Sequence, residues 1–156
     1  NLISGGMLAL MQHPDQWRRL LDDRSLLPTA VEELLRWVTP VMQFQRTAQR
    51  DTEIAGVPIA EGERVALFYV SANRDEAVFA RPDVFDVGRT PNEHITFGAG
   101  GPHFCLGNSL ARLEIRLMFE ELLSRAPGIE QAGPHRRLRS NFLNGIKAMP
   151  VRFRAA

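Results

Sequence analysis

A glycine-rich segment that holds the only cysteine of the chain is the strongest constraint in this sequence. Residues 97–107 read FGAGGPHFCLG, and a run without glycine or proline that favours a helix follows up to Pro127. A sulfur at the start of a helix faces unpaired backbone N–H groups and the positive end of the helix dipole, which favour a thiolate. Because the thiolate binds metals and glycines permit a close approach of the backbone, Cys105 is predicted to ligate the metal of a flat, apolar cofactor.

Four other interpretations of this segment compete with metal ligation. A phosphate-binding loop requires G-x-G-x-x-G, but His103 stands where the third glycine belongs, and no Walker lysine follows. A cysteine nucleophile with His103 as its base is compatible with the composition, although the two side chains need not meet in a tight loop. Zinc ligation by Cys105 with His94, His103 and His135 lacks a standard ligand spacing. A buried, structural cysteine is the commonest fate of a lone cysteine in general.

The composition describes one ordinary soluble domain, or part of a larger one. The chain has 156 residues, of which 44% are hydrophobic and 24% charged, so disordered, collagen-like and membrane-spanning classes are excluded. Its 19 Lys and Arg and 18 Asp and Glu leave a net charge of +1, which does not predict a nucleic-acid partner. One cysteine excludes an internal disulfide. The chain lacks a signal peptide and any apolar run of about 18 residues, so we expect a cytoplasmic protein without a membrane span.

Hydrophobic periodicity and breakers predict a mainly α fold with small β-hairpins. Helices are expected over residues 2–12, 14–21, 29–38 and 108–126, and Thr29 with Glu32 matches a capping box at the start of the third. A hairpin is expected over 52–69, turning at Glu61-Gly62-Glu63, and another over 138–153. The stretch 71–102 is predicted to be irregular, with a short helix near 75–79, and to be ordered by its phenylalanines.

A second constellation is formed by Glu33 and Arg36, which are three residues apart and so lie on one helix face. Taken alone, such a pair is usually a solvated surface pair worth a few tenths of a kcal/mol. Apolar neighbours such as Leu34 and Trp37 indicate that part of this helix is buried, where a charged pair needs further partners. Arg89 is the candidate third member.

Taken in order, Glu33-x-x-Arg36, Arg89 and the 97–107 segment resemble the cytochrome P450 family, whose signatures are an E-x-x-R helix and a loop of F-G-x-G-x-H-x-C-x-G type. The resemblance covers nearly the whole chain and implies the C-terminal part of the P450 fold. Residues 1–156 would then be a fragment of a single domain whose N-terminal half is absent, with the haem-ligand loop at 97–107. The acid–alcohol pair that activates oxygen would lie just upstream of Asn1, so the fragment alone is expected to be inactive.

The resemblance implies haem b (iron protoporphyrin IX) as the cofactor and Cys105 as its catalytic, axial thiolate ligand. Arg46 and His103 resemble the residues that hold a haem propionate. The complete set of cofactor-binding candidates is Arg46, Phe97, Gly98, His103, Cys105 and Gly107. Glu33, Arg36 and Arg89 resemble a buried network that is structural and locks the irregular segment under the haem.

The loop also departs from the usual motif, because Gly100-Gly101-Pro102 makes it one residue longer. The His103-x-Cys105 end is intact, so haem ligation should be retained. The longer loop, with segments 37–41, 44–47, 68–73 and 143–147, resembles bacterial P450s that hydroxylate the terminal methyl of sterol side chains and methyl-branched lipids. The substrate-channel candidates are then the apolar Val41, Met42, Phe44 and Leu143. Ordinary core packing explains each of them equally well.

The resemblance implies a monooxygenase that inserts one oxygen atom from O₂ into a C–H bond of a small apolar substrate. Electrons would come from a ferredoxin or similar carrier, with Arg112 and Arg116 as cationic contacts for it. Alternatively, both arginines only solvate an exposed helix face. Two rival functions remain open, namely a haem-binding module without oxygen activation and a peroxygenase that uses peroxide without a redox partner.

Overall fold

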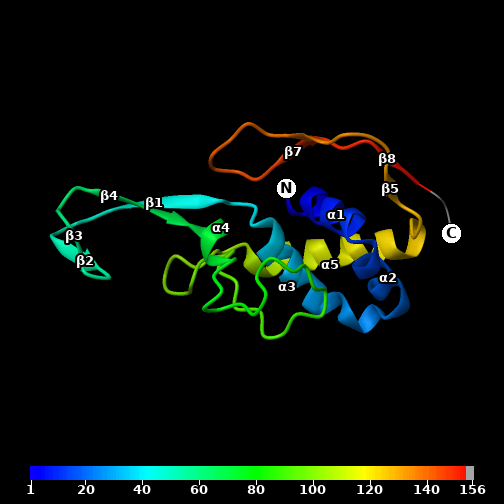
Figure 1. Ribbon diagram of the computed structural model, residues 1–156, viewed down its shortest axis with the longest axis horizontal. Helices are drawn as coiled ribbons and strands as arrows, with labels where there is room; N and C mark the ends of the chain where they lie inside the picture. Colours follow the sequence, from blue (N-terminus) through cyan, green and yellow to red (C-terminus); the bar gives the residue numbers. More distant parts are fainter. Residues whose placement is uncertain (154–156) are drawn as a thin grey trace.

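Four α-helices form the body of the molecule. The computed structural model describes residues 1–153. The four helices lie against one another (Figure 1) and are α1 (Leu2–Gln12), α2 (Pro14–Asp22), α3 (Leu27–Val38) and α5 (Asn108–Arg125). A short 3₁₀ helix (Arg24–Leu26) leads into α3, and the one-turn α4 (Tyr69–Ala72) follows the first strands. The predicted mainly α fold with small β elements is confirmed.

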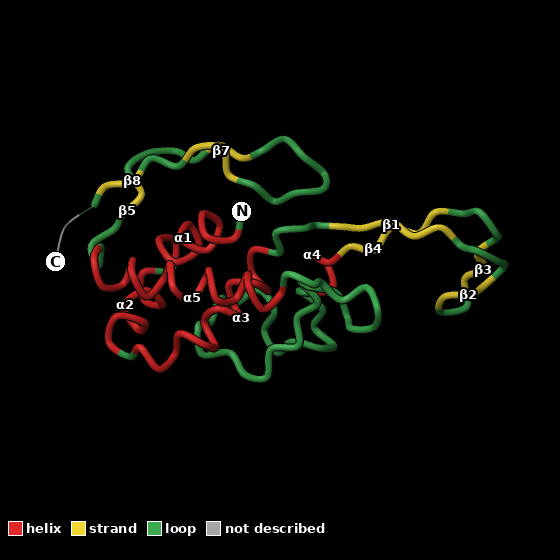
Figure 2. Tube along the Cα trace, turned by 180° about the vertical axis from the view of Figure 1, so that it is seen from behind, coloured by secondary structure: helices red, strands yellow, loops and turns green. Residues whose placement is uncertain are grey.

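The strands form four antiparallel pairs of two strands each within residues 1–153. β1 (Gln43–Thr47) pairs with β4 (Arg64–Phe68), and β2 (Thr52–Ile54) pairs with β3 (Val57–Ile59). Together they make an arm that extends away from the helices, with β2 and β3 towards its tip (Figure 2). Nearer the C-terminus, β5 (Glu130–Gln131) pairs with β8 (Val151–Arg152), and β6 (Arg136–Arg137) pairs with β7 (Ile146–Ala148).

The arm corrects the expected single hairpin with its turn at residues 61–63. The inner turn consists of Ala55 and Gly56, whose φ angles are 51° and 79°. Two residues with positive φ make the type I′ turn that suits the twist of two antiparallel strands. Gly62 instead lies in the loop that returns the chain to β4, whose partner β1 begins before the predicted range. The C-terminal prediction was also incomplete, because β5 and β6 precede residue 138.

The apolar core lies between α3 and the helices on either side of it. Leu10 of α1, Leu20 of α2, Leu34 of α3 and Phe119 of α5 are all fully buried. Because each helix has one apolar stripe, packing the four together removes those stripes from water, at about 25 cal/mol per Å². Across residues 1–153, no helix combines the length and the hydropathy that a bilayer span requires.

The long segment between α4 and α5 is irregular yet ordered, as its phenylalanines predicted. Residues 73–107 form neither helix nor strand, and the expected helix at 75–79 is only a turn. Phe79, Phe85 and Val87 are nevertheless buried, and the last two belong to the same apolar core as the helices. The segment is therefore part of the folded body.

The close approach of α1 to α3 depends on a glycine. A Cβ atom on Gly5 would lie 2.7 Å from Cγ1 of Val38, a β-branched side chain that is stiff within a helix. We expect Gly5→Ala to lower the free energy of unfolding by about 1 kcal/mol, because overpacking costs about 1–3 kcal/mol and alanine gains up to about 1 kcal/mol over glycine in a helix. Urea denaturation measures the loss.

The matched control for Gly5→Ala removes the obstructing methyl groups. In the Gly5→Ala/Val38→Ala protein, the loss should be smaller than the sum of the two single losses, because the methyl group added at position 5 then has room. A Gly5→Ala protein as stable as the unsubstituted chain would show that the helices can separate at no cost.

The start of α3 differs from the predicted capping box. The helix begins at Leu27, and the hydroxyl oxygen of Thr29 lies 2.8 Å from the carbonyl oxygens of both Leu26 and Val87, which share its one donor. Glu32 does not reach back to the helix end, because its carboxylate binds side chains from other parts of the chain. The end of α3 follows the prediction, since Thr39 adopts a left-handed conformation (φ 42°) before Pro40.

Candidate functional site

The cysteine loop has a backbone that only glycines adopt without strain. Gly98, Gly100 and Gly101 have φ angles of 93°, 93° and 77°. The backbone N–H of Cys105 donates to the carbonyl of Phe97 at 3.0 Å and so closes the loop. α5 begins three residues after Cys105, which places the cysteine beside the N-terminus of the helix, as predicted.

The surroundings of Cys105 fit a large apolar cofactor. The cysteine is free and exposed, and the neighbouring Phe104 and Leu106 are 40% and 100% exposed. A Cβ atom on Gly98 or Gly107 would meet nothing within 4 Å, so the loop leaves open space on both sides of the cysteine. A soft thiolate donor in an apolar, open setting suits the iron of a haem.

The structure also tests the competing interpretations of the cysteine. Its exposure contradicts a buried, structural role. Within residues 1–153, no three His, Cys, Asp or Glu side chains gather where they could hold a metal ion, which contradicts the zinc site. His103 and Cys105 share no hydrogen bond in that part of the chain, so the geometry gives no support to a nucleophile–base pair.

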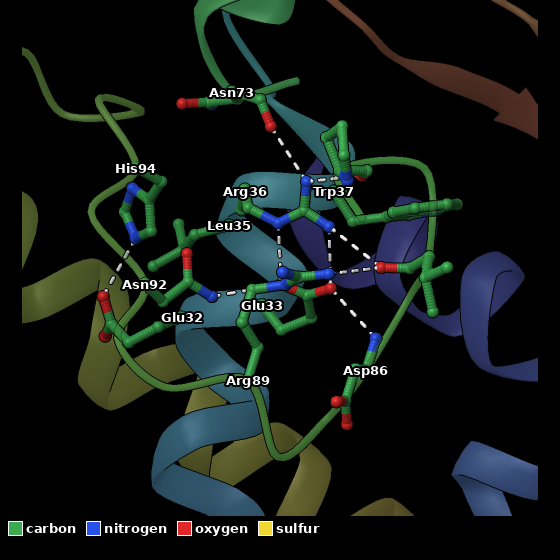
Figure 3. A network of polar contacts seen from close by, with 12 residues as sticks. Glu32, Glu33, Leu35, Arg36, Trp37, Asn73, Asp86, Arg89, Asn92 and His94 are labelled. Atoms are coloured by element: carbon green, nitrogen blue, oxygen red, sulfur yellow. Dashed lines mark hydrogen bonds and ion pairs between the residues drawn. The ribbon is translucent and has the colours of Figure 1, made fainter. Parts of the chain in front are cut away.

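The predicted Glu33–Arg36–Arg89 network is assembled in the structure (Figure 3). Glu33 and Arg36 are fully buried and form two parallel hydrogen bonds, Nε to Oε2 and Nη2 to Oε1, each 2.8 Å long. Arg89 Nε and Asn92 Nδ2 also donate to Oε2, at 3.1 and 3.0 Å, and the Asp86 backbone N–H donates to Oε1 at 3.0 Å. The buried carboxylate is thus saturated with donors.

The two arginines of this network also hold the irregular segment. Arg36 donates to three backbone carbonyls, those of Asn73, Pro82 and Val84, at 2.9, 2.9 and 3.3 Å. Arg89 donates to the carbonyls of Ala80, Arg81 and Val84. Buried carbonyls outside helices and strands need such partners, so the network supplies the hydrogen bonds that secondary structure supplies elsewhere.

A second polar cluster, which sequence reasoning missed, lies next to the first. Glu32 accepts from Arg112 Nε and Nη2 at 2.7 and 2.9 Å, and its Oε2 lies 2.9 Å from His94 Nε2. Burial raises the pKa of Glu32, but the hydrogen bonds from His94 and Arg112 outweigh it and lower that pKa to about 2. The hydrogen bond to Glu32 raises the pKa of Arg112 in turn.

This cluster changes the interpretation of Arg112. Its guanidinium is committed to Glu32 and also bonds Asn108, so it is not a free surface cation. Arg116 is half-exposed and lies 3.6 Å from Glu120 on the same helix. Of the two arginines proposed to contact an electron carrier, Arg116 is therefore the more accessible.

Arg46 lies on β1, exposed, and bonds only its neighbour's carbonyl within the described residues. Its Nη1 donates to Gln45 at 3.0 Å, and its Cζ lies 5.8 Å from the ring centroid of Phe44. Among residues 1–153, its Nε and Nη2 have no hydrogen-bond acceptor, so they are available to an anionic group. His103 is likewise exposed at the cysteine loop.

The four predicted substrate-channel residues lie together where β1 begins. Val41 forms an isolated antiparallel bridge with Leu143, and the Met42 backbone N–H donates to the carbonyl of Phe142 at 2.9 Å. The rings of Phe44 and Phe142 are 5.4 Å apart, and they are 42% and 41% exposed. Phe142, which sequence reasoning missed, therefore belongs to the same apolar surface.

Comparison with known proteins identifies the family of this chain. The family model described as Cytochrome P450 matches residues 8–126. A steroid C26-monooxygenase of Rhodococcus jostii (strain RHA1) is 49% identical over all of this chain and 33% of its own length. A methyl-branched lipid omega-hydroxylase of Mycobacterium tuberculosis (strain H37Rv) is 49% identical over 97% of this chain and 36% of its own length.

The same relation holds for solved structures. The crystal structure of P450BioI in complex with an acyl carrier protein ligated to hexadec-9Z-enoic acid superposes with a TM-score of 0.95 at 44% identity, over 99% of this chain and 40% of that one. The chain thus spans about a third of the length of the curated relatives it matches. With its E-x-x-R network and its cysteine loop, it belongs to the cytochrome P450 family.

Proposed function

We propose that residues 1–156 form the haem-binding C-terminal portion of a P450 monooxygenase, and that further sequence supplies the rest of the domain. The extent of the relatives supports this, since the chain covers 33% and 36% of two of them. An uncovered apolar stripe supports it too. Leu106 and three leucines of α5 that follow at helical spacing, Leu110, Leu113 and Leu117, are 100%, 60%, 44% and 48% exposed.

The observation that carries the proposal is the exposed Cys105 in its glycine loop beside the start of α5. Cys105 would be the axial ligand of haem b, which when bound supplies the oxidising chemistry. Phe97, Gly98 and Gly107 would contact the ring. Arg46 and His103 would each hold a propionate by a charge-assisted hydrogen bond.

The proposed reaction is hydroxylation of an apolar substrate, a sterol side chain or a methyl-branched lipid. One oxygen atom of O₂ enters a C–H bond, and the other leaves as water with two protons and two electrons from a ferredoxin-type carrier. The names of two relatives and the apolar surface of Val41, Met42, Phe44 and Leu143 support this substrate class. Arg116 supports an acidic carrier, because it is an accessible cation on the helix that follows Cys105.

The test uses the full-length protein that contains this chain, with a sterol or a methyl-branched fatty acid as substrate. Under ¹⁸O₂, with ferredoxin, its reductase and NADPH, we expect a hydroxylated product that carries one ¹⁸O atom and requires the ferredoxin. Product formed with peroxide but not with O₂ and ferredoxin would favour a peroxygenase. Bound haem without product under either condition would favour a binding module.

A further inference from the structure

The cluster of Glu32, His94 and Arg112 has no part in the proposed chemistry. It nevertheless adjoins residues 94–97, the stem through which the chain enters the cysteine loop. Glu32 comes from α3 and Arg112 from α5, and His94 precedes the loop by three residues. Figure 3 shows the carboxylate of Glu32 reaching His94 to one side of the buried Glu33 network. The cluster therefore ties two helices to the segment that enters the loop.

His94 has one hydrogen bond on each side of its ring. The backbone N–H of Thr96 donates to Nδ1 at 3.2 Å, which leaves Nε2 to donate to Glu32. Arg112 contacts Phe97, the residue that follows Thr96 and begins the loop, because its Cζ lies 4.7 Å from the centroid of the phenylalanine ring. A cation over an aromatic face holds that ring in place.

Phe97 passes this constraint on to the cysteine. Its carbonyl accepts the Cys105 backbone N–H at 3.0 Å, and the Gly98 N–H donates to the carbonyl of Ile95 at 2.8 Å. A contiguous path thus runs from Glu32 through Arg112 and Phe97 to the backbone of Cys105.

The other side of the stem is held separately by Asn73, which is fully buried. Its Oδ1 accepts from the Ile95 backbone N–H at 2.9 Å, and its Nδ2 lies 3.0 Å from the Thr96 hydroxyl. Asn73 and the Glu33 network hold the fold on that side, and the Glu32–Arg112 pair is about one-third exposed. Loss of this pair should therefore loosen the loop without unfolding the chain.

We propose that Glu32 is a positioning residue for the cysteine loop, which acts through Arg112 and His94 to fix Phe97 and with it the backbone that carries Cys105. The consequence for the haem rests on the proposed function, whereas the consequence for the loop concerns this chain alone. Groups one step removed from a ligand orient it and tune the metal.

The first test is hydrogen exchange of the full-length protein that contains this chain. In Glu32→Gln and in Arg112→Met, we expect the amides of Gly98 and Cys105 to exchange at least about fivefold faster, with core amides such as that of Leu10 unchanged. The double variant should be no faster than the faster single variant, because the two residues act in series. Arg112→Lys should give an intermediate rate, since lysine keeps the charge but loses the two-pronged hydrogen bond.

Arg116→Met is the matched control, one turn further along α5 and outside the cluster. It should leave every amide of the loop at its original rate. Loop amides that behave in Glu32→Gln as they do in this control would overturn the proposal. Equal acceleration of loop and core amides would also overturn it, because the cluster would then only stabilise the whole chain.

A second measurement separates this proposal from the proposed function. In the haem-loaded full-length protein, Glu32→Gln should shift the reduction potential of the iron, and Arg116→Met should not. If the unsubstituted protein shows no thiolate-ligated haem while the loop amides still respond to Glu32→Gln, the proposed function fails and the positioning role stands. If haem binds through Cys105 but Glu32→Gln changes neither the exchange of the loop amides nor the reduction potential, the positioning role is wrong and the proposed function stands.

Discussion

Cys105→Ser is expected to abolish the strongly red-shifted Soret band of the reduced, carbon-monoxide-bound full-length protein. The band reports the ligand opposite carbon monoxide, and a serine hydroxyl is a harder donor that stays protonated near neutral pH. The substitution exchanges one atom of an exposed side chain, so the fold should not change. Absorption of the reduced protein with and without carbon monoxide measures the loss, which should be complete.

Ser109→Ala provides the control for this measurement, because Ser109 lies four residues further on in the first turn of α5. Its band should equal that of the unsubstituted protein. A red-shifted band that persists in Cys105→Ser would remove Cys105 as the axial ligand. The absence of any such band from the unsubstituted protein would return the loop to the nucleophile interpretation.

Arg36→Met should lower the free energy of unfolding of the chain by about 3–5 kcal/mol, the usual cost of removing one partner from a buried ion pair. Methionine has a similar length but no donor, so the fully buried Glu33 would lose both of its shortest hydrogen bonds. The carbonyls of Asn73 and Pro82 would lose a partner as well. This is a large share of the roughly 5–15 kcal/mol that stabilises a typical domain.

Arg19→Met is the matched comparison, because Arg19 forms an equally short ion pair, 2.8 Å from Asp86, with 46% of its side chain exposed. Surface pairs contribute about 0–1 kcal/mol, so the loss should be several times smaller than for Arg36→Met. Urea denaturation of both variants gives the two values. An Arg36→Met protein no less stable than Arg19→Met would show that the buried pair contributes specificity rather than stability.

Structural features that depend only on residues close together in the sequence could be predicted from the sequence. Apolar periodicity located the four long helices, and the three-residue spacing of Glu33 and Arg36 placed both on one helix face, where they do pair. The glycine loop was recognised for the same reason, since its positive φ angles follow from residue type. Such features need no knowledge of which distant segment lies opposite.

Glu32 shows why the rest could not be predicted. Locally, Thr29 and Glu32 have the spacing of a capping box, and nothing nearby contradicts it. The observed partners, His94 and Arg112, lie 62 and 80 residues further along the chain. Arg112 offers the carboxylate two hydrogen bonds from a charged donor, whereas a helix-end N–H offers one from a neutral donor, so the tertiary contact prevails. The same separation in sequence explains why the pairing of Arg112 with Glu32 was not predicted.

The position of the turn in the arm was predicted wrongly for a different reason. Residues typical of strands lie near both Gly56 and Gly62, so residue type alone does not show which of the two glycines forms the hairpin turn. The choice depends on Ala55 accepting a positive φ of 51°, which the pairing of β2 with β3 stabilises. Strand pairing decides such a turn, and pairing is a property of both strands together.

The count of donors on Arg36 has a consequence for the whole stretch between α4 and α5. A guanidinium has five N–H groups, and here all of them are used, two on Glu33 and three on backbone carbonyls. A lysine could serve at most three acceptors from a single point, so it could not substitute. Three points in the first half of this stretch, which has no repeating backbone pattern, are thereby fixed by the donors of one distant side chain.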